Sequence, residues 1–106
     1  MQLSIIDRLA LPVALAKGAK GSFVSLILAE GIEEAIKITK EDLTTYKIVS
    51  EENGIKWDEK SDTEHTLELE FDKEETALIV KGFEEIEKAG EATKDLLATY
   101  KKFMNL

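Results

Sequence analysis

Apolar residues crowd the first third of the chain. From Leu3 to Ala16 they recur at helical spacing, with Ser4 and Asp7 placed as the cap and first turn of a helix. Pro12 lies inside this stretch and has no backbone donor, so we expect the helix to kink or restart there. A second helix is predicted from about Ser22 to Ile36, and its first two turns are apolar on nearly every side. Such a helix is expected to be central or to contact a partner.

The middle of the chain changes to the alternating pattern of strands. Tyr46–Ser50 and Ile55–Asp58 flank Asn53-Gly54, a pair that fits the positive φ angles of a type I′ turn, so a β-hairpin is predicted. Apolar and polar residues alternate from Thr66 to Phe71, which is typical of a half-buried strand. The acidic stretch 58–65 between them is expected to be a solvated loop. It lacks the glycine and the twelfth-position acid of a calcium-binding EF-hand, and no metal site is predicted.

Two further helices complete the pattern. Asp72 and Glu75 form an acidic capping box at the start of one, which Gly90 is placed to end. The last helix is predicted from about Ala92 to Phe103. We therefore expect residues 1–106 to form a single α+β domain. In it, a small antiparallel three-stranded sheet, made of the hairpin and one strand, is flanked by two N-terminal and two C-terminal helices.

Charge is divided unevenly along the chain. Residues 1–29 carry one acid and three bases, whereas the remainder carries 21 acids and 11 lysines, for a net charge of −8. This acidity opposes direct binding to nucleic acid, which requires clustered basic residues. The absence of cysteine fits a reducing cytoplasm. The stretch Leu3–Ala16 is interrupted by Asp7 and Arg8, so neither a signal peptide nor a membrane helix is expected.

A glycine- and lysine-containing motif separates the first two predicted helices, and its candidate ligand-binding residues are Lys17, Gly18, Lys20, Gly21 and Ser22. Glycines let backbone N–H groups approach a ligand, and a helix start with lysines favours anions, so a nucleotide-like anion is one candidate ligand. The spacing is not that of a P-loop, and an ordinary helix–helix connection explains the same residues. Gly18-Ala19-Lys20-Gly21 is also similar to the G-x-x-G loop of KH domains. That resemblance implies single-stranded nucleic acid, which the charge opposes.

No arrangement for catalysis is recognisable. His65 is the only histidine, and Glu68 and Glu70 occupy the predicted solvent face of a strand, where carboxylates are poor general acids near neutrality. We therefore expect no catalytic residue and no cofactor. Glu68 and Glu70 remain candidates for contacting a protein through an acidic surface. Trp57 either packs on a helix or anchors such an interface.

Four short stretches occur in order along most of the chain: Ile6-Asp7-Arg8-Leu9-Ala10-Leu11-Pro12, Lys20-Gly21-Ser22-Phe23, Ile55-Lys56-Trp57 and Tyr100-Lys101-Lys102-Phe103. Together they resemble small proteins encoded by bacterial viruses and prophages. The resemblance implies a viral accessory protein that acts on a component of the bacterial host, and it implies no role for any individual residue.

These observations favour a non-enzymatic binding protein. The first hypothesis is that it binds and modulates a host protein through its acidic surface. The alternatives are a site for a small anionic ligand at the glycine–lysine motif, or a structural or assembly component. Because the second predicted helix is apolar all round, we also expect a homo-oligomer. Its predicted interface residues are Leu3, Ile6, Phe23 and Ile27.

Overall fold

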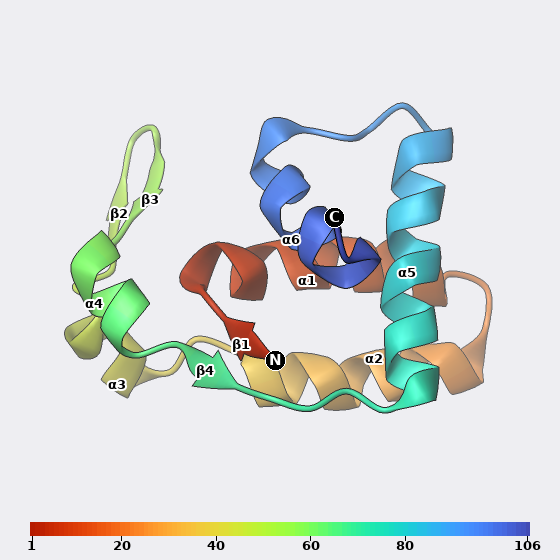
Figure 1. The fold of residues 1–106 in the computed structure, drawn as a ribbon, viewed down its shortest axis with the longest axis horizontal. Coiled ribbons are helices and arrows are strands. Elements are labelled where there is room, and N and C mark those ends of the chain that lie inside the picture. Colours follow the sequence, from red (N-terminus) through yellow and green to blue (C-terminus); the bar gives the residue numbers. More distant parts are fainter.

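Six helices and two separate pairs of strands make up the fold, which a computed structural model describes over residues 1–106 (Figure 1). In chain order the elements are β1 (Gln2–Leu3), α1 (Ile5–Ala19), α2 (Phe23–Ile36), α3 (Lys40–Thr45), β2 (Val49–Glu51), β3 (Gly54–Lys56), α4 (Glu59–Glu64), β4 (Leu67–Glu68), α5 (Lys73–Lys88) and α6 (Lys94–Met104). Both strand pairs are antiparallel. The α+β class therefore agrees with the prediction at this coarse level.

The predicted three-stranded sheet is wrong. The hairpin strands β2 and β3 pair only with each other, and β4 pairs with β1. Leu3 lies opposite Leu67, and Gln2 lies opposite Glu68. The strand expected from Thr66 to Phe71 is thus hydrogen-bonded in a sheet over only two residues. Its predicted inward face is correct, because Leu67, Leu69 and Phe71 all pack against the core.

The hairpin turn also differs from the prediction. Glu51 pairs with Gly54, which leaves Glu52 and Asn53 as the connecting residues. Gly54 has a φ of 129°, but Asn53 does not have a positive φ, so the expected type I′ conformation is absent. The positive φ falls on the glycine alone, where it costs least. Figure 1 shows the hairpin standing apart from the helices α1, α2, α5 and α6.

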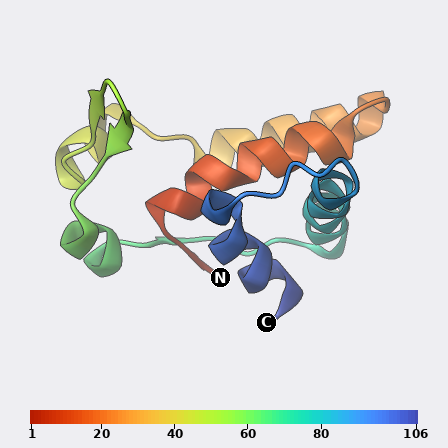
Figure 2. The same cartoon turned by 90° about the horizontal axis from the view of Figure 1, so that it is seen from above.

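Helix α1 is the centre of the molecule and packs against α2, α5 and α6 (Figure 2). It continues through Pro12, so the helix neither ends nor restarts there. At its crossing with α5 two glycines allow the backbones to touch. A Cβ added at Gly18 would lie 2.6 Å from the carbonyl oxygen of Leu78, and one added at Gly82 would lie 2.6 Å from the carbonyl carbon of Ala14. This close crossing explains why Gly18 is buried inside a helix rather than placed in the predicted loop.

The acidic stretch 58–65 is mostly exposed, as expected, but it forms the short helix α4 instead of a loop. Asp58 caps α4 by accepting a hydrogen bond from the backbone N–H of Ser61 at 3.2 Å. Asp62 is buried, and its carboxylate accepts a hydrogen bond of 2.9 Å from the backbone N–H of Ile5. A residue that looks like a surface acid in the sequence therefore ties α4 to the start of α1.

A buried polar cluster joins α1 to α6. The carboxylate of Asp7 accepts hydrogen bonds from the hydroxyl of Thr99 at 2.6 Å, from the backbone N–H of Ser4 at 3.0 Å and from the ammonium group of Lys102. Burial raises the pKa of Asp7, but the bonds from Lys102, Thr99 and Ser4 outweigh it and hold the pKa below its ordinary value. The carboxylate is therefore charged near neutrality and orients α6 against α1.

Candidate functional site: a groove between α1 and the hairpin

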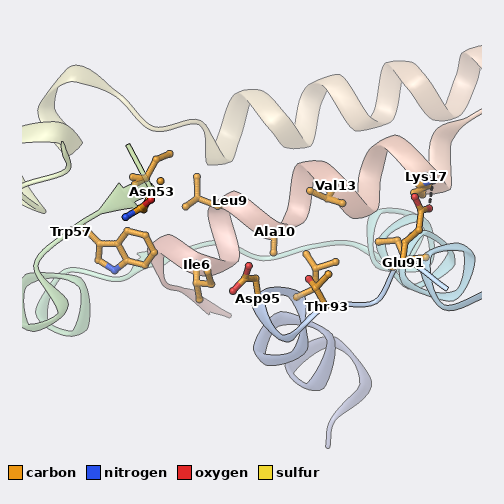
Figure 3. Close-up of a pocket in the computed structure, with 14 residues that line it drawn as sticks. Ile6, Leu9, Ala10, Val13, Lys17, Asn53, Trp57, Glu91, Thr93 and Asp95 are labelled. Carbon is orange, nitrogen blue, oxygen red and sulfur yellow. Dashed lines mark ion pairs between the residues drawn. The ribbon is translucent and has the colours of Figure 1, made fainter. Parts of the chain in front are cut away.

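A groove of about 700 Å³ lies between α1, the hairpin and the segment that leads into α6 (Figure 3). Its floor is one side of α1, formed by Ile6, Leu9, Ala10 and Val13. These positions follow the three- and four-residue spacing that places side chains on one helix face. Val13 is 45% exposed although it is apolar. The floor therefore offers an apolar surface that the chain leaves partly uncovered at Ile6, Leu9 and Val13, whereas Ala10 is buried.

The hairpin supplies the second wall. Ile55 and Trp57 line the groove together with Asn53, and Figure 3 shows the indole of Trp57 across the groove from Ile6 and Leu9. Trp57 is partly exposed and does not belong to the hydrophobic core. A half-exposed tryptophan beside an apolar floor is the arrangement found at the centre of many protein interfaces.

The third wall carries most of the polar groups. Lys17 of α1 forms an ion pair with Glu91, so its charge is neutralised at the edge of the groove. Asp95 lines the groove without an ion-pair partner in the chain. Thr93 precedes α6 as its N-cap, but its side chain makes no capping hydrogen bond. One unpaired carboxylate and one free hydroxyl thus accompany an apolar floor.

Buried hydrogen bonds hold the hairpin wall in place. The guanidinium of Arg8 donates to the carbonyl oxygens of Ile36 at 2.9 Å and Lys37 at 2.6 Å, where it satisfies acceptors at the end of α2. It also donates to the carboxylate of Asp42 at 2.7 Å. Burial raises the pKa of Asp42, but hydrogen bonds from Thr39 and Arg8 outweigh it and lower that pKa below its ordinary value. The hairpin lies between Asp42 and Asp62. Asp42 is bonded to Arg8 of α1 and Asp62 to Ile5 of α1, so the segment is held to α1 at both ends.

The residues of the predicted anion-binding motif are divided between the end of α1 and the turn that leads into α2. Lys17 and Gly18 belong to α1, and Lys17 is ion-paired with Glu91. Only Lys20 and Gly21 form the turn between the helices, and Ser22 caps α2 by accepting from the N–H of Ser25 at 3.2 Å. Because Gly18 lies in the helix crossing, the comparison with the KH loop also fails. The glycine that suggested a flexible loop serves close helix packing instead.

The predicted acidic contact residues lie elsewhere. Glu68 belongs to β4, and its carboxylate accepts a hydrogen bond of 2.9 Å from the amino group of Met1. Glu70 accepts from the same group at 3.3 Å. Neither residue lines the groove, so the structure does not bring them together with Trp57 in one site.

The four predicted interface residues separate into three places. Leu3 is 1% exposed and belongs to the core, so its assignment to an interface is wrong. Ile6 lines the groove. Phe23 and Ile27 are exposed on α2, which does not contribute to the groove lining. The apolar stretch that the sequence presents as one surface is therefore divided between a core and two separate surfaces.

Sequence reasoning missed Leu9, Val13, Thr93 and Asp95 as groove residues. The one local signal was that α1 is apolar on two faces: Leu11 and Leu15 point into the core, while Leu9 and Val13 do not. The remaining walls come from segments distant in sequence, which no local pattern brings together.

Comparison of the chain with protein families, with curated proteins and with solved structures found no match. No group of three or more histidine, aspartate or glutamate side chains is arranged to hold a metal ion. None of the helices combines the length and the apolar character needed to cross a membrane.

Proposed function

We propose that the protein acts by binding another protein, without catalysis, and that the groove between α1 and the hairpin holds an apolar side chain from a basic segment of that partner. The observation that carries this proposal is the open apolar floor of α1 facing Trp57. Apolar contacts at the centre of an interface supply most of its affinity, and tryptophan is enriched there.

Charge supports a basic segment as the occupant. The chain has a net charge of −8, the single lysine of the groove is paired with Glu91, and Asp95 is unpaired. A partner with lysine or arginine beside an apolar residue would complement this edge and would be attracted by the whole acidic molecule. A host protein bound by a viral accessory protein is the partner class that we favour.

Trp57 allows a direct test because it is the only tryptophan. The probe is a synthetic amphipathic peptide of leucine and lysine, with a leucine–glutamate peptide of the same pattern as its control. Fluorescence of Trp57 is expected to shift to shorter wavelength with the basic peptide, and the affinity should fall as salt is added. The acidic peptide should leave the spectrum unchanged.

Two variants locate the contact. Val13→Lys places a positive charge on the groove floor and should weaken binding of the basic peptide by roughly tenfold or more, because it removes the apolar contact of a valine side chain, about 1.5 kcal/mol or more, and repels the lysines of the peptide. Val49→Lys is the matched control, since it changes the net charge equally and Val49 is similarly exposed at 51% but does not line the groove. Equal effects of the two substitutions, or a shift with both peptides, would contradict the proposal.

A further inference from the structure

A second apolar surface lies on α2, away from the groove. Phe23 is 85% exposed, Val24 78% and Ile27 70%, and we call these three residues the α2 patch. They share the helix face opposite the buried Ala29 and Ile32. These residues belong to the first turns of α2, which follows the turn between α1 and α2 at one end of the molecule (Figure 2). Contiguous exposed apolar side chains of this size mark interaction sites on soluble proteins.

Two opposite charges flank the α2 patch at equal spacing. Lys20 lies in the turn before α2, three residues before Phe23, and Glu30 lies within α2, three residues after Ile27. Both are exposed, and neither takes part in any ion pair or side-chain hydrogen bond of the chain, unlike Lys37, which contacts Glu34 at 2.6 Å. From Lys20 to Glu30 the order is therefore a charge, Phe23, Ile27 and the opposite charge. The same order of charged and apolar residues is found when the segment is followed in reverse.

That arrangement is complementary to itself when reversed. We propose that a second copy of this chain covers the α2 patch, with two α2 helices packed antiparallel about a two-fold axis near Ser25. Phe23 then lies on Ile27 of the second copy, and Lys20 pairs with Glu30 of the second copy, twice by symmetry. A contact about a two-fold axis requires one surface to complement itself. Here apolar side chains face apolar side chains, and Lys20 faces Glu30.

The dimer is expected to be weak. The α2 patch and the partly exposed Leu26 form a small surface, and interfaces below about 1,200 Å² in total are typical of weak, transient contacts. The inference rests on α2 and the turn that precedes it, and it stands independently of the groove, because neither Lys20, Glu30 nor any residue of the α2 patch lines the groove.

Charge reversal distinguishes a second copy from any other occupant. Sedimentation velocity over a concentration series should show the unaltered chain forming dimers. Lys20→Glu and Glu30→Lys should each weaken the dimer by roughly tenfold, since each turns two attractions into two repulsions. An equal mixture of the two variants should dimerise as the unaltered chain does, because the two acids of one variant then face the two lysines of the other. The double variant Lys20→Glu/Glu30→Lys should also dimerise as the unaltered chain does, because the two charges are exchanged and attract each other again.

Control variants distinguish loss of the dimer interface from loss of the folded structure. Lys94→Glu reverses an exposed charge of α6 and should leave the dimer unchanged, whereas Ile27→Asp should abolish it. Circular dichroism of each variant at low concentration should match that of the unaltered chain. An unaltered chain that stays monomeric throughout the series would overturn the proposal, as would a mixture that associates no better than its components. Groove binding by the basic peptide should persist in all of these variants.

Discussion

The substitution Gly82→Ala tests the packing on which the fold depends. A Cβ at this position would overlap the carbonyl group of Ala14, with the carbonyl carbon at 2.6 Å and the Cα at 3.0 Å. These are backbone atoms of α1, so no side-chain rotation relieves the contact. The two central helices must separate, which loosens the neighbouring core residues Leu78 and Phe83.

The magnitude follows from two opposing terms. Alanine stabilises a helix interior by about 1 kcal/mol relative to glycine. Overpacking costs about 1–3 kcal/mol where side chains can adjust, and more where they cannot. Because the contacts are with backbone atoms, the overpacking cost lies at or above the upper end of that range, and we expect Gly82→Ala to lower the free energy of unfolding by about 2 kcal/mol or more, out of the roughly 5–15 kcal/mol typical of a domain. Urea unfolding followed by far-UV circular dichroism measures this change.

Gly31→Ala is the matched control. Gly31 also lies inside a helix, α2, but nothing lies within 4 Å of a Cβ added there. The same chemical change should therefore stabilise the protein by about 0.5–1 kcal/mol. The reasoning is refuted if Gly82→Ala is as stable as the unaltered chain, or if both substitutions change stability in the same direction.

Three further predictions concern the polar contacts. Asp7→Asn should destabilise the chain by about 2–4 kcal/mol in urea unfolding, because the buried partners of Asp7 lose a charged acceptor. An effect below about 0.5 kcal/mol, the size usual for a surface change, would contradict the polar cluster assigned to Asp7. Arg8→Met should cost about 3 kcal/mol, since carbonyl acceptors at the end of α2 and the carboxylate of Asp42 lose their donor, and thermal unfolding that is unchanged would refute it. The pKa values of Asp7 and Asp42 are lowered from 3.8 in the folded chain, so the stability that these groups contribute is present above about pH 4 and is lost as the pH falls through their folded pKa values. A melting temperature that stays constant as the pH falls through this acidic range would show that these carboxylates are not linked to folding.

Local signals in the sequence correctly predicted the starts of α1, α2 and α5. The capping pairs Ser4 with Asp7 and Asp72 with Glu75 both form reciprocal hydrogen bonds, as their spacing indicates. A cap depends on four consecutive residues, so the sequence contains all the information that it requires. The alternation after Thr66 correctly predicted which side chains of that segment face the core, because this pattern is also contained in a few consecutive residues.

Contacts between distant segments could not be predicted in this way. Gly18 looks like a loop residue until Gly82 is placed against α1, and Asp62 looks like a solvated acid until it meets the N–H of Ile5. Strand β1 has only two residues and thus no period to recognise. The groove combines three segments far apart in the chain, so no local pattern distinguishes its apolar floor from an oligomer interface.

The most direct test of the account is an amide chemical-shift map of the chain titrated with the leucine–lysine peptide. Binding in the groove predicts that the largest changes cluster in the first three turns of α1, around Trp57 and in the segment that leads into α6. Changes confined to the α2 patch, changes spread evenly over the acidic surface, or no change at all would contradict the assignment of the groove as the binding site.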